Sequence, residues 1–308
     1  QTSTVVVEEL ESGDVTELTV GPFDATYSGT WEFDGAAGFD RSHPDLEALV
    51  TVGSRQQAVG DSFDHPSGVR FTVDGVNYER AIHYDTTEAP GFFGSNEVVA
   101  VRTPASGQVI THLELTAENR TSETIVFGDG GTFYDGASIS NTRFDLTPGD
   151  RYEGFTNARV DGDDLSTLEL EAGDSGSYYI LAVTDVESLP ELGLDVGFTD
   201  DKSDPEIRFD LGDEPDLPEF ELVELDIPSE RTEGDQEFGV VVENVGDAAG
   251  TFRGAIQWQD DGDWYHLPPP LEADLEPGED ARTFATSDAS PGEEYDYRVV
   301  PFDEEFSL

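Results

Sequence analysis

Two short acidic clusters are the best candidates for a functional site in the sequence. Each has carboxylates on both sides of a glycine: Asp161 and Asp163 in the first cluster, and Asp260, Asp261 and Asp263 in the second. Carboxylate oxygens at this spacing suit the flexible, oxygen-rich loops that bind Ca²⁺. Because the chain has 69 Asp and Glu residues, solvated turns of the same composition also arise by chance. We therefore expect no resident cofactor, with weakly bound cations as the alternative.

The remaining polar residues form no catalytic motif that their spacing reveals. The five histidines lack metal-site spacing, although one pair could face each other across strands: His83 and His112. Residues 128–131 are rich in glycine but do not join a strand to a helix, as a phosphate-binding loop does. The chain has no cysteine, which excludes disulfides and thiolate chemistry. No carboxylate pair stands out for glycoside hydrolysis, so we predict that the protein is not an enzyme.

Asn119 starts the single Asn-x-Ser/Thr sequence of the chain, followed by Arg120 and Thr121. This motif is the acceptor for N-linked glycans in exported proteins, and here it lies where an expected strand ends. The sequence therefore predicts glycosylation at Asn119.

Three aromatic residues flank the second acidic cluster: Trp258, Trp264 and Tyr265. An exposed patch of these rings would contact a carbohydrate or a protein partner, whereas alternate rings on a hairpin would fill a sandwich core. We favour the core.

The charge balance is the most unusual property of the chain. It has 15 Lys and Arg residues, of which Lys202 is the one lysine, and a formal net charge of -54. Such charge opposes the compact state in dilute buffer, but molar salt shortens the Debye length to roughly 3 Å. We therefore expect a folded protein of a halophilic archaeon. The same charge repels phosphates, which excludes nucleic acid as a partner.

Strand signals dominate the sequence. β-branched and apolar residues are concentrated in segments of strand length: residues 4–10, 15–20, 69–78, 97–102, 108–117, 124–127, 177–184 and 192–198. Asp74-Gly75 suits a type I′ turn, so residues 69–78 should form a hairpin. Alternation over residues 108–117 predicts one face in the core and one in solvent. Residues 42–49 have the features of one short helix.

Two tandem immunoglobulin-like β-sandwiches are the expected all-β architecture. The first domain is predicted at residues 1–212, with an N-terminal strand and a last strand near 207–209, and the second domain at residues 219–308. Residues 213–218, rich in Asp, Glu and Pro, form the linker. The halves also share a pattern, because a strand ending in Glu-Asn, at Asn119 and Asn244, precedes a Leu-x-Pro-Gly turn at residues 146–149 and 275–278.

These motifs carry two resemblances to known families. Residues 238–251 resemble the immunoglobulin-like "cell adhesion related domain found in bacteria", and residues 275–279 fit its later Pro-Gly turn. Shorter stretches of the first half, residues 59–63, 69–73, 113–119 and 146–149, resemble the telokin-like immunoglobulin domain of haloarchaeal secreted proteins. Neither family has a catalytic residue set. The resemblances imply adhesion, display or assembly outside the cell.

The N-terminal segment contains a run suited to strand exchange: Thr4, Val5, Val6 and Val7. A β-branched segment can add to the open sheet edge of a neighbour, and repeated head-to-tail contacts of this kind build a filament. The alternative is an ordinary first strand of its own domain. The sequence starts at Gln1 and has no Met, which predicts the removal of a signal peptide. No run reaches the roughly 18 apolar residues of a membrane span, so we expect no transmembrane segment.

We therefore expect a secreted cell-surface protein with a structural or adhesive role, which self-associates or binds other surface proteins. In its sharpest form, this hypothesis makes the chain the subunit of a filament assembled by N-terminal strand donation. The alternative is a monomeric cell-surface module that binds a glycan or a protein partner.

Overall fold

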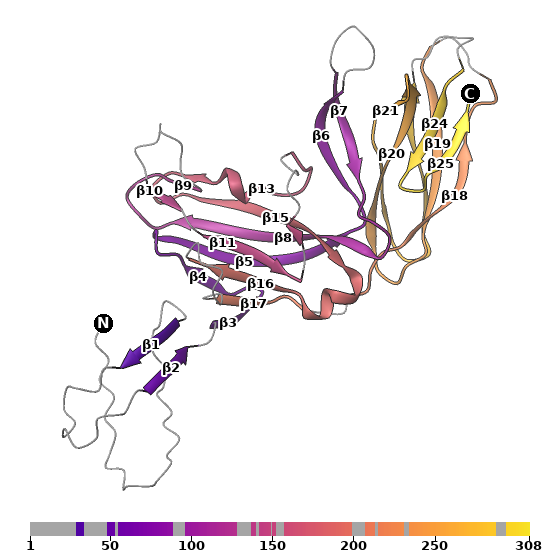
Figure 1. Ribbon diagram of the computed structural model, residues 1–308. Helices are drawn as coiled ribbons and strands as arrows, with labels where there is room; N and C mark the ends of the chain where they lie inside the picture. The colour runs from indigo at the N-terminus through magenta and orange to yellow at the C-terminus, as the bar shows by residue number, and fades with distance from the viewer. Residues whose placement is uncertain are drawn as a thin grey trace, which may run out of the picture.

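The computed structural model describes residues 29–33, 48–52, 55–88, 96–127, 137–139, 142–148, 150–151, 157–198, 207–212, 215–230, 234–287 and 294–308. These residues lie mostly in strands, which confirms the all-β prediction (Figure 1). The helical content among them is two short 3₁₀ segments, η1 (Leu165–Thr167) and η2 (Val186–Glu191). Neither helix in the described residues is long and apolar enough to cross a membrane.

Two sheets pack face to face in the first half of the chain. One has the order β12-β15-β8-β5-β4, with β13 also paired to β15; its strands are β4 (Ser62–Asp64), β5 (Val69–Glu79), β8 (Gln108–Asn119), β12 (Asp150–Arg151), β13 (Asp163–Asp164) and β15 (Ser175–Asp185). The other has the order β11-β16-β17-β3; its strands are β3 (Arg55–Ala58), β11 (Arg143–Thr147), β16 (Gly193–Gly197) and β17 (Ile207–Asp210). Alternate side chains of the two sheets fill one buried core, including Phe71, Leu115, Ile180, Phe144, Leu194 and Phe209.

Two small sheets accompany these layers. β10 (Ala137–Ile139), β9 (Ile125–Phe127) and β14 (Glu169–Leu170) form one, in this order. β1 (Gly29–Phe33) pairs with β2 (Ala48–Val52) in the other.

The second half has its own core between two further sheets. One sheet has the order β18 (Phe220–Asp226), β19 (Gln236–Asn244) and β23 (Asp280–Ser287). The other has the order β21 (Asp263–His266), β20 (Gly250–Asp260), β24 (Asp296–Val300) and β25 (Glu304–Ser307), with β22 (Leu271–Leu275) also on β20. The core between them includes Phe238, Val240, Phe252, Ile256 and Tyr297.

A long hairpin joins the two halves. β6 (Ile82–Glu88) and β7 (Asn96–Arg102) pair with each other, extend away from the first sandwich and lie beside β20 and β21 (Figure 1). Ala81 and Val101 of this region form a separate buried cluster with Ala255 of β20. The segment that connects the two halves also contacts the first half. Leu217 packs on the first core, and the Pro218 carbonyl accepts a hydrogen bond from Arg80 Nε at 2.9 Å.

The predicted domain boundaries stay predictions.

Two local predictions are wrong. Asp74-Gly75 is not a hairpin turn, because β5 runs unbroken from Val69 to Glu79 and pairs with β8 on both sides of a bulge at this point. An Asp-Gly pair can adopt the backbone angles of a turn or of a bulge. Pairing with the long strand β8 on both sides selects the bulge. The helix expected over residues 42–49 is absent at Ala48 and Leu49, which begin β2; its remaining residues lie outside the described ones.

The other expected strands within the described residues form, although the burial of β8 differs from its prediction. The half that follows His112 alternates as expected, with Leu115 and Ala117 buried and Glu114 half-buried. The first half is buried on both faces, because Ile110 packs with Tyr179 and Leu181 in a second cluster behind the sheet. The expected strands at residues 4–10 and 15–20 lie outside the described residues.

Candidate functional site

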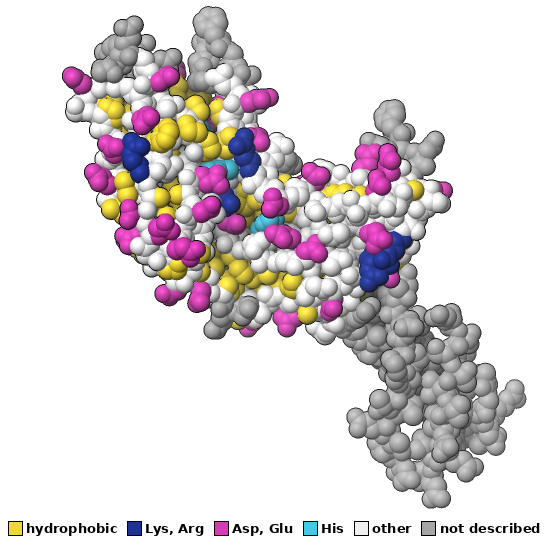
Figure 2. Space-filling model, turned by 180° about the vertical axis from the view of Figure 1, so that it is seen from behind, with side chains coloured by type: hydrophobic (Ala, Val, Ile, Leu, Met, Phe, Trp, Pro, Cys, Tyr) yellow, Lys and Arg dark blue, Asp and Glu magenta, His cyan; other side chains and the backbone are white. Residues whose placement is uncertain are grey.

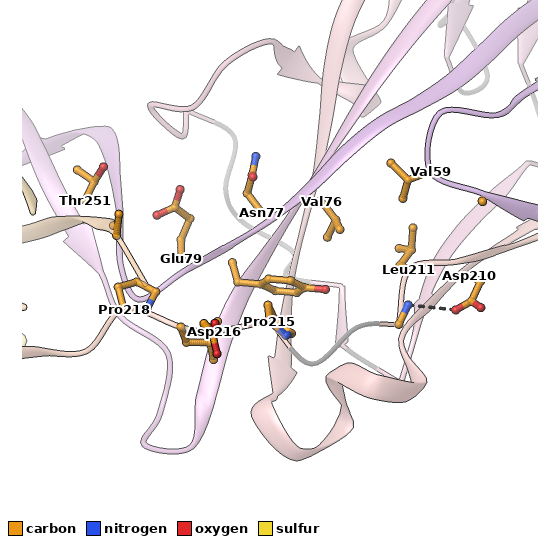
Figure 3. A pocket seen from close by; sticks show the side chains of 16 residues that line it. Val59, Val76, Asn77, Glu79, Asp210, Leu211, Pro215, Asp216, Pro218 and Thr251 are labelled. Atoms are coloured by element: carbon orange, nitrogen blue, oxygen red, sulfur yellow. Dashed lines mark hydrogen bonds between the residues drawn. The ribbon is translucent and has the colours of Figure 1, made fainter. Parts of the chain in front are cut away.

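A groove of about 630 Å³ opens where the two halves meet (Figure 3). The end of β5 and the connecting residues 215–218 form two of its walls. The groove runs from Glu79 and Thr251 at one end to Val59 and Leu211 at the other (Figure 3). Its lining mixes apolar side chains with three carboxylates: Glu79, Asp210 and Asp216.

One ion pair beside the groove ties β5 to β20. Arg253 Nη1 lies 2.6 Å from Glu79 Oε2, and the side chains are 15% and 21% exposed. The Arg253 Nε atom is also 3.9 Å from the Glu272 carboxylate. Separating a pair this far from water leaves a poorly solvated charge on each side, which is strongly unfavourable. The pair therefore holds the halves together.

A polar network makes a second tie between the hairpin and β21. Glu88 Oε1 lies 2.5 Å from His266 Nδ1, and Glu88 Oε2 accepts the His266 backbone N–H at 2.9 Å. Arg298 Nε donates to Gln257 Oε1 at 2.6 Å, which turns the Gln257 amide nitrogen toward His266 Nε2 at 2.8 Å. His266 Nε2 is then the acceptor, and its Nδ1–H donates to Glu88. Every member thus has a partner.

His83 and His112, which the sequence allows to face each other, have different partners. His83 Nε2 lies 3.1 Å from the Gly254 carbonyl of β20, a third tie across the junction. His112 packs edge-on against Tyr179, and its Nε2 has no hydrogen-bond partner among the described residues. Burial lowers the pKa of both imidazoles. His83 contacts β20 of the second half, whereas His112 contacts Tyr179 of β15. His43 lies outside the described residues.

His65 is a buried histidine of the first half with a defined tautomer. Its Nδ1 accepts the Ser67 backbone N–H at 3.1 Å, so the ring proton is on Nε2, which lies 2.7 Å from Thr142 Oγ1. Burial lowers the pKa of His65 from 6.5 to about 4. Protonating Nδ1 would also remove an acceptor from Ser67.

Lowering the pH from 7 to 5 is expected to destabilise the fold through His65. Its folded pKa lies below the unfolded value, so the stabilisation is complete above pH 6.5 and is lost as the pH falls toward 4. At pH 5 the loss is about 2 kcal/mol. Urea unfolding in molar KCl would measure it, and H65Q, which cannot titrate, should show a smaller fall. A variant with the same pH dependence as the unmodified protein would contradict this assignment.

The acidic clusters lie in turns. Asp260 and Asp263 pair across the ends of β20 and β21, and the two residues between them, Asp261 and Gly262, have φ angles of 50° and 92°. This is the left-handed backbone of a type I′ hairpin turn. Asp161 and Asp163 are exposed, and Asp163 is the first residue of the two-residue strand β13. Among the described residues, no group of three or more His, Asp or Glu side chains is placed to hold a metal ion.

The three aromatic residues separate onto two faces. Trp258 pairs with Tyr265 across β20 and β21, their ring centroids are 5.5 Å apart, and Trp258 packs on the second core. Trp264 is the adjacent residue on β21, so it points to the opposite face. There the Arg298 guanidinium stacks over its ring at 4.5 Å. Trp258 therefore has the core role, whereas Trp264 belongs to the polar network.

Asn119 is fully buried, with 0% of its surface exposed. Its Nδ2 donates to the carbonyls of Glu123, Leu170 and Glu171 at 2.7 to 3.0 Å, and its Oδ1 accepts the Thr121 backbone N–H at 2.9 Å. A glycan on Nδ2 would displace these bonds. The folded structure therefore argues against the glycosylation predicted at this position.

Asn244 makes the same arrangement in the second half. Its Nδ2 donates to the carbonyls of Ala248 and Leu275, and its Oδ1 accepts the Gly246 N–H. The backbone N–H of Gly278 donates to the Asn244 carbonyl, as that of Gly173 does to the Asn119 carbonyl. The correspondence between the two halves therefore holds at the two Glu-Asn pairs. The predicted correspondence of the two Leu-x-Pro-Gly turns is wrong. Residues 170–174, and not 146–150, correspond to residues 275–279.

On the face that Figure 2 shows, acidic side chains are scattered widely, with few Lys or Arg between them. Exposed large apolar side chains are few among the described residues: Val59, Val223, Val245 and Phe284. The proposed assembly residues, Thr4, Val5, Val6 and Val7, lie outside the described residues, so their prediction stands as made.

Comparison with known proteins adds little to this geometry. No family model matches the chain, and no curated protein matches it significantly. Among solved structures, a conserved hypothetical protein from Bacillus anthracis is 19% identical, over 46% of this chain and 87% of that chain, with a TM-score of 0.26. A likeness this remote carries no conclusion. The two family resemblances noted in the sequence remain predictions.

Proposed function

We propose that this protein is an extracellular structural protein of a halophilic archaeon, whose copies assemble into a surface filament by donating the N-terminal strand. One observation carries the proposal. Three half-buried or buried polar residues have partners on the second half: Glu79 at the end of β5, and His83 and Glu88 on the β6–β7 hairpin. Breaking such contacts leaves buried polar groups unsatisfied. We therefore expect the junction to resist bending, as the subunit of a filament under tension must.

The net charge of the chain supports a high-salt environment. An excess of 54 negative charges is tolerable where molar salt screens it. It also keeps copies apart unless a specific contact joins them, which favours an ordered assembly over aggregation.

Removing residues 1–10 tests the filament. The complete chain should form regular fibres in molar KCl, visible by negative-stain electron microscopy, because the donated strand bridges copies. The shortened chain should keep its far-UV circular dichroism and remain monomeric by light scattering. A length-matched control with Ser in place of Val5, Val6 and Val7 should behave in the same way. Normal fibres from the shortened chain would rule out strand donation.

A second candidate function is a monomeric module that binds a glycan or protein partner. Arg298 favours it, because this guanidinium is fixed by Gln257 and Trp264 and forms no ion pair with a described carboxylate. An acidic sugar or a carboxylate of a partner would complement it. Sedimentation of the complete chain in molar KCl separates the two functions, since a monomer at high protein concentration favours the module.

A further inference from the structure

The groove between the halves contains a sheet edge that the described strands leave open. β4 pairs with β5 from Arg70 to Thr72, and Val73 still bonds to residues 60 and 61. From Gly75 onward β5 pairs with β8 on one side, and no described strand lies on its other side. Extended backbone with one partner strand can accept a second.

We propose that this edge of β5 accepts, as an added strand, the segment of a second copy that contains Thr4, Val5, Val6 and Val7. The inference rests on the proposed function and names the acceptor that strand donation requires. Main-chain hydrogen bonds to β5 would supply the register-independent part of the affinity, and side-chain pockets would set the register.

The groove has the walls that such a strand needs. Val76 of β5 packs partly on the first core, and Val59 and Leu211 line the far end (Figure 3). Pro215 and Pro218 line it from the connecting segment. Proline has no N–H, so these walls add apolar surface without a competing donor. Alternate valines of an added strand would pack against this surface.

The charge and the length of the groove also suit the donated N-terminal segment. Residues 1–7 carry no Asp or Glu and five β-branched side chains, although the whole chain has 69 acids. The groove has carboxylates at Asp210 and Asp216, in addition to the paired Glu79, so it repels an acidic strand and admits an uncharged one. Glu8 and Glu9 then limit the insertion to a few residues. At about 3.3 Å per residue, the edge from Gly75 to Glu79 offers a similar length.

The edge of β18 is one other long edge, and it is a poorer acceptor. β18 has seven residues and borders its sheet, and Val223 is 54% exposed on it. A register shift between Leu222 and Glu224 interrupts its pairing, and carboxylates line it at Glu221, Glu224 and Asp226. Bulges and charges are the features that protect sheet edges from strand addition. The edge of β5 has its bulge at Asp74, before the groove begins.

Disulfide trapping tests the contact, because the complete chain has no cysteine. A tagged donor copy carries one substitution, V5C, V6C or V7C, and an untagged acceptor copy carries N77C on β5. The matched control acceptor carries E221C on the edge of β18. After oxidation in molar KCl, at least one donor should give a heterodimer with N77C at ten or more times its yield with E221C. A peptide of residues 1–10 should compete with the linkage.

The possible outcomes test the groove, the second copy and the filament separately. Equal linkage to both acceptors, or none to N77C, overturns the groove as acceptor. When V6C and N77C are placed in one copy, a loop within that copy instead of a dimer overturns the second copy as occupant. Electron microscopy of the unmodified chain keeps the two proposals apart. Fibres without linkage at the groove leave the filament standing and refute this acceptor, whereas absence of both fibres and linkage refutes both.

Discussion

Removing salt is expected to unfold this protein. The melting temperature should be highest in molar KCl and should fall as the Debye length grows from roughly 3 Å at 1 M to about 10 Å at 0.1 M. The cause is repulsion within a chain of net charge -54. Far-UV circular dichroism and calorimetry across this range measure the effect. A melting temperature that does not change with salt would contradict adaptation to high salt.

One row of carboxylates shows where the repulsion acts. Glu243 on β19 lies directly opposite Glu221 on β18 and opposite Asp280 on β23. Cβ atoms in such positions are about 5 Å apart, and like charges there destabilise a sheet. None of the three forms an ion pair among the described residues, whereas Arg282 on the same sheet pairs with Asp226.

The substitution E243Q should therefore weaken the salt dependence. It removes two repulsions at once, so we expect about 0.5 to 1 kcal/mol of added stability at low salt, or about 1 to 3 °C, and little change in molar KCl. The control E97Q removes a charge that faces Thr87 across β6 and β7, and it should have less effect. Equal salt slopes for the two variants would show that the row does not concentrate the repulsion.

The sequence predicts the strands well because their signal is local. Runs of β-branched and other apolar residues identify β7, β9, β15 and β16, and the short run near Ile207 identifies β17. From the sequence, the Asp74-Gly75 bulge could not be distinguished from a turn, because Asp and Gly tolerate the unusual backbone angles of both. The difference lies in β8, which pairs with β5 across the bulge and is more than thirty residues away.

The candidate site was not predictable for the same reason. Glu79 and Arg253 are 174 residues apart, and Glu88 and His266 are 178 apart. In a chain with so many acids, no feature of the sequence separates these two carboxylates from solvated ones. The repeat shows the limit of pattern matching. Residues 146–149 contain the expected Pro-Gly, whereas the true counterpart of Pro277 is Ala172, identified by the bond from Gly173 to Asn119.

The two buried asparagines are expected to be the most sensitive single positions of the described fold. The substitutions N119D and N244D keep the size of the side chain but replace the donor Nδ2 with an oxygen that faces backbone carbonyls: those of Glu123, Leu170 and Glu171 at Asn119, and those of Ala248 and Leu275 at Asn244. Buried acceptors left without donors cost about 1 to 3 kcal/mol each. We expect each variant to lose about 3 to 5 kcal/mol.

Urea unfolding in molar KCl measures these losses. The control is Asn77, which is exposed and whose side-chain amide donates to Glu114. The variant N77A should change stability by less than about 0.5 kcal/mol. If the two arrangements are the equivalent structural elements that their bonds indicate, N119D and N244D should lose similar amounts. Intact mass of the protein produced in its natural host completes the test, because a glycan on a stably folded Asn119 would show that Nδ2 does not make the bonds described above.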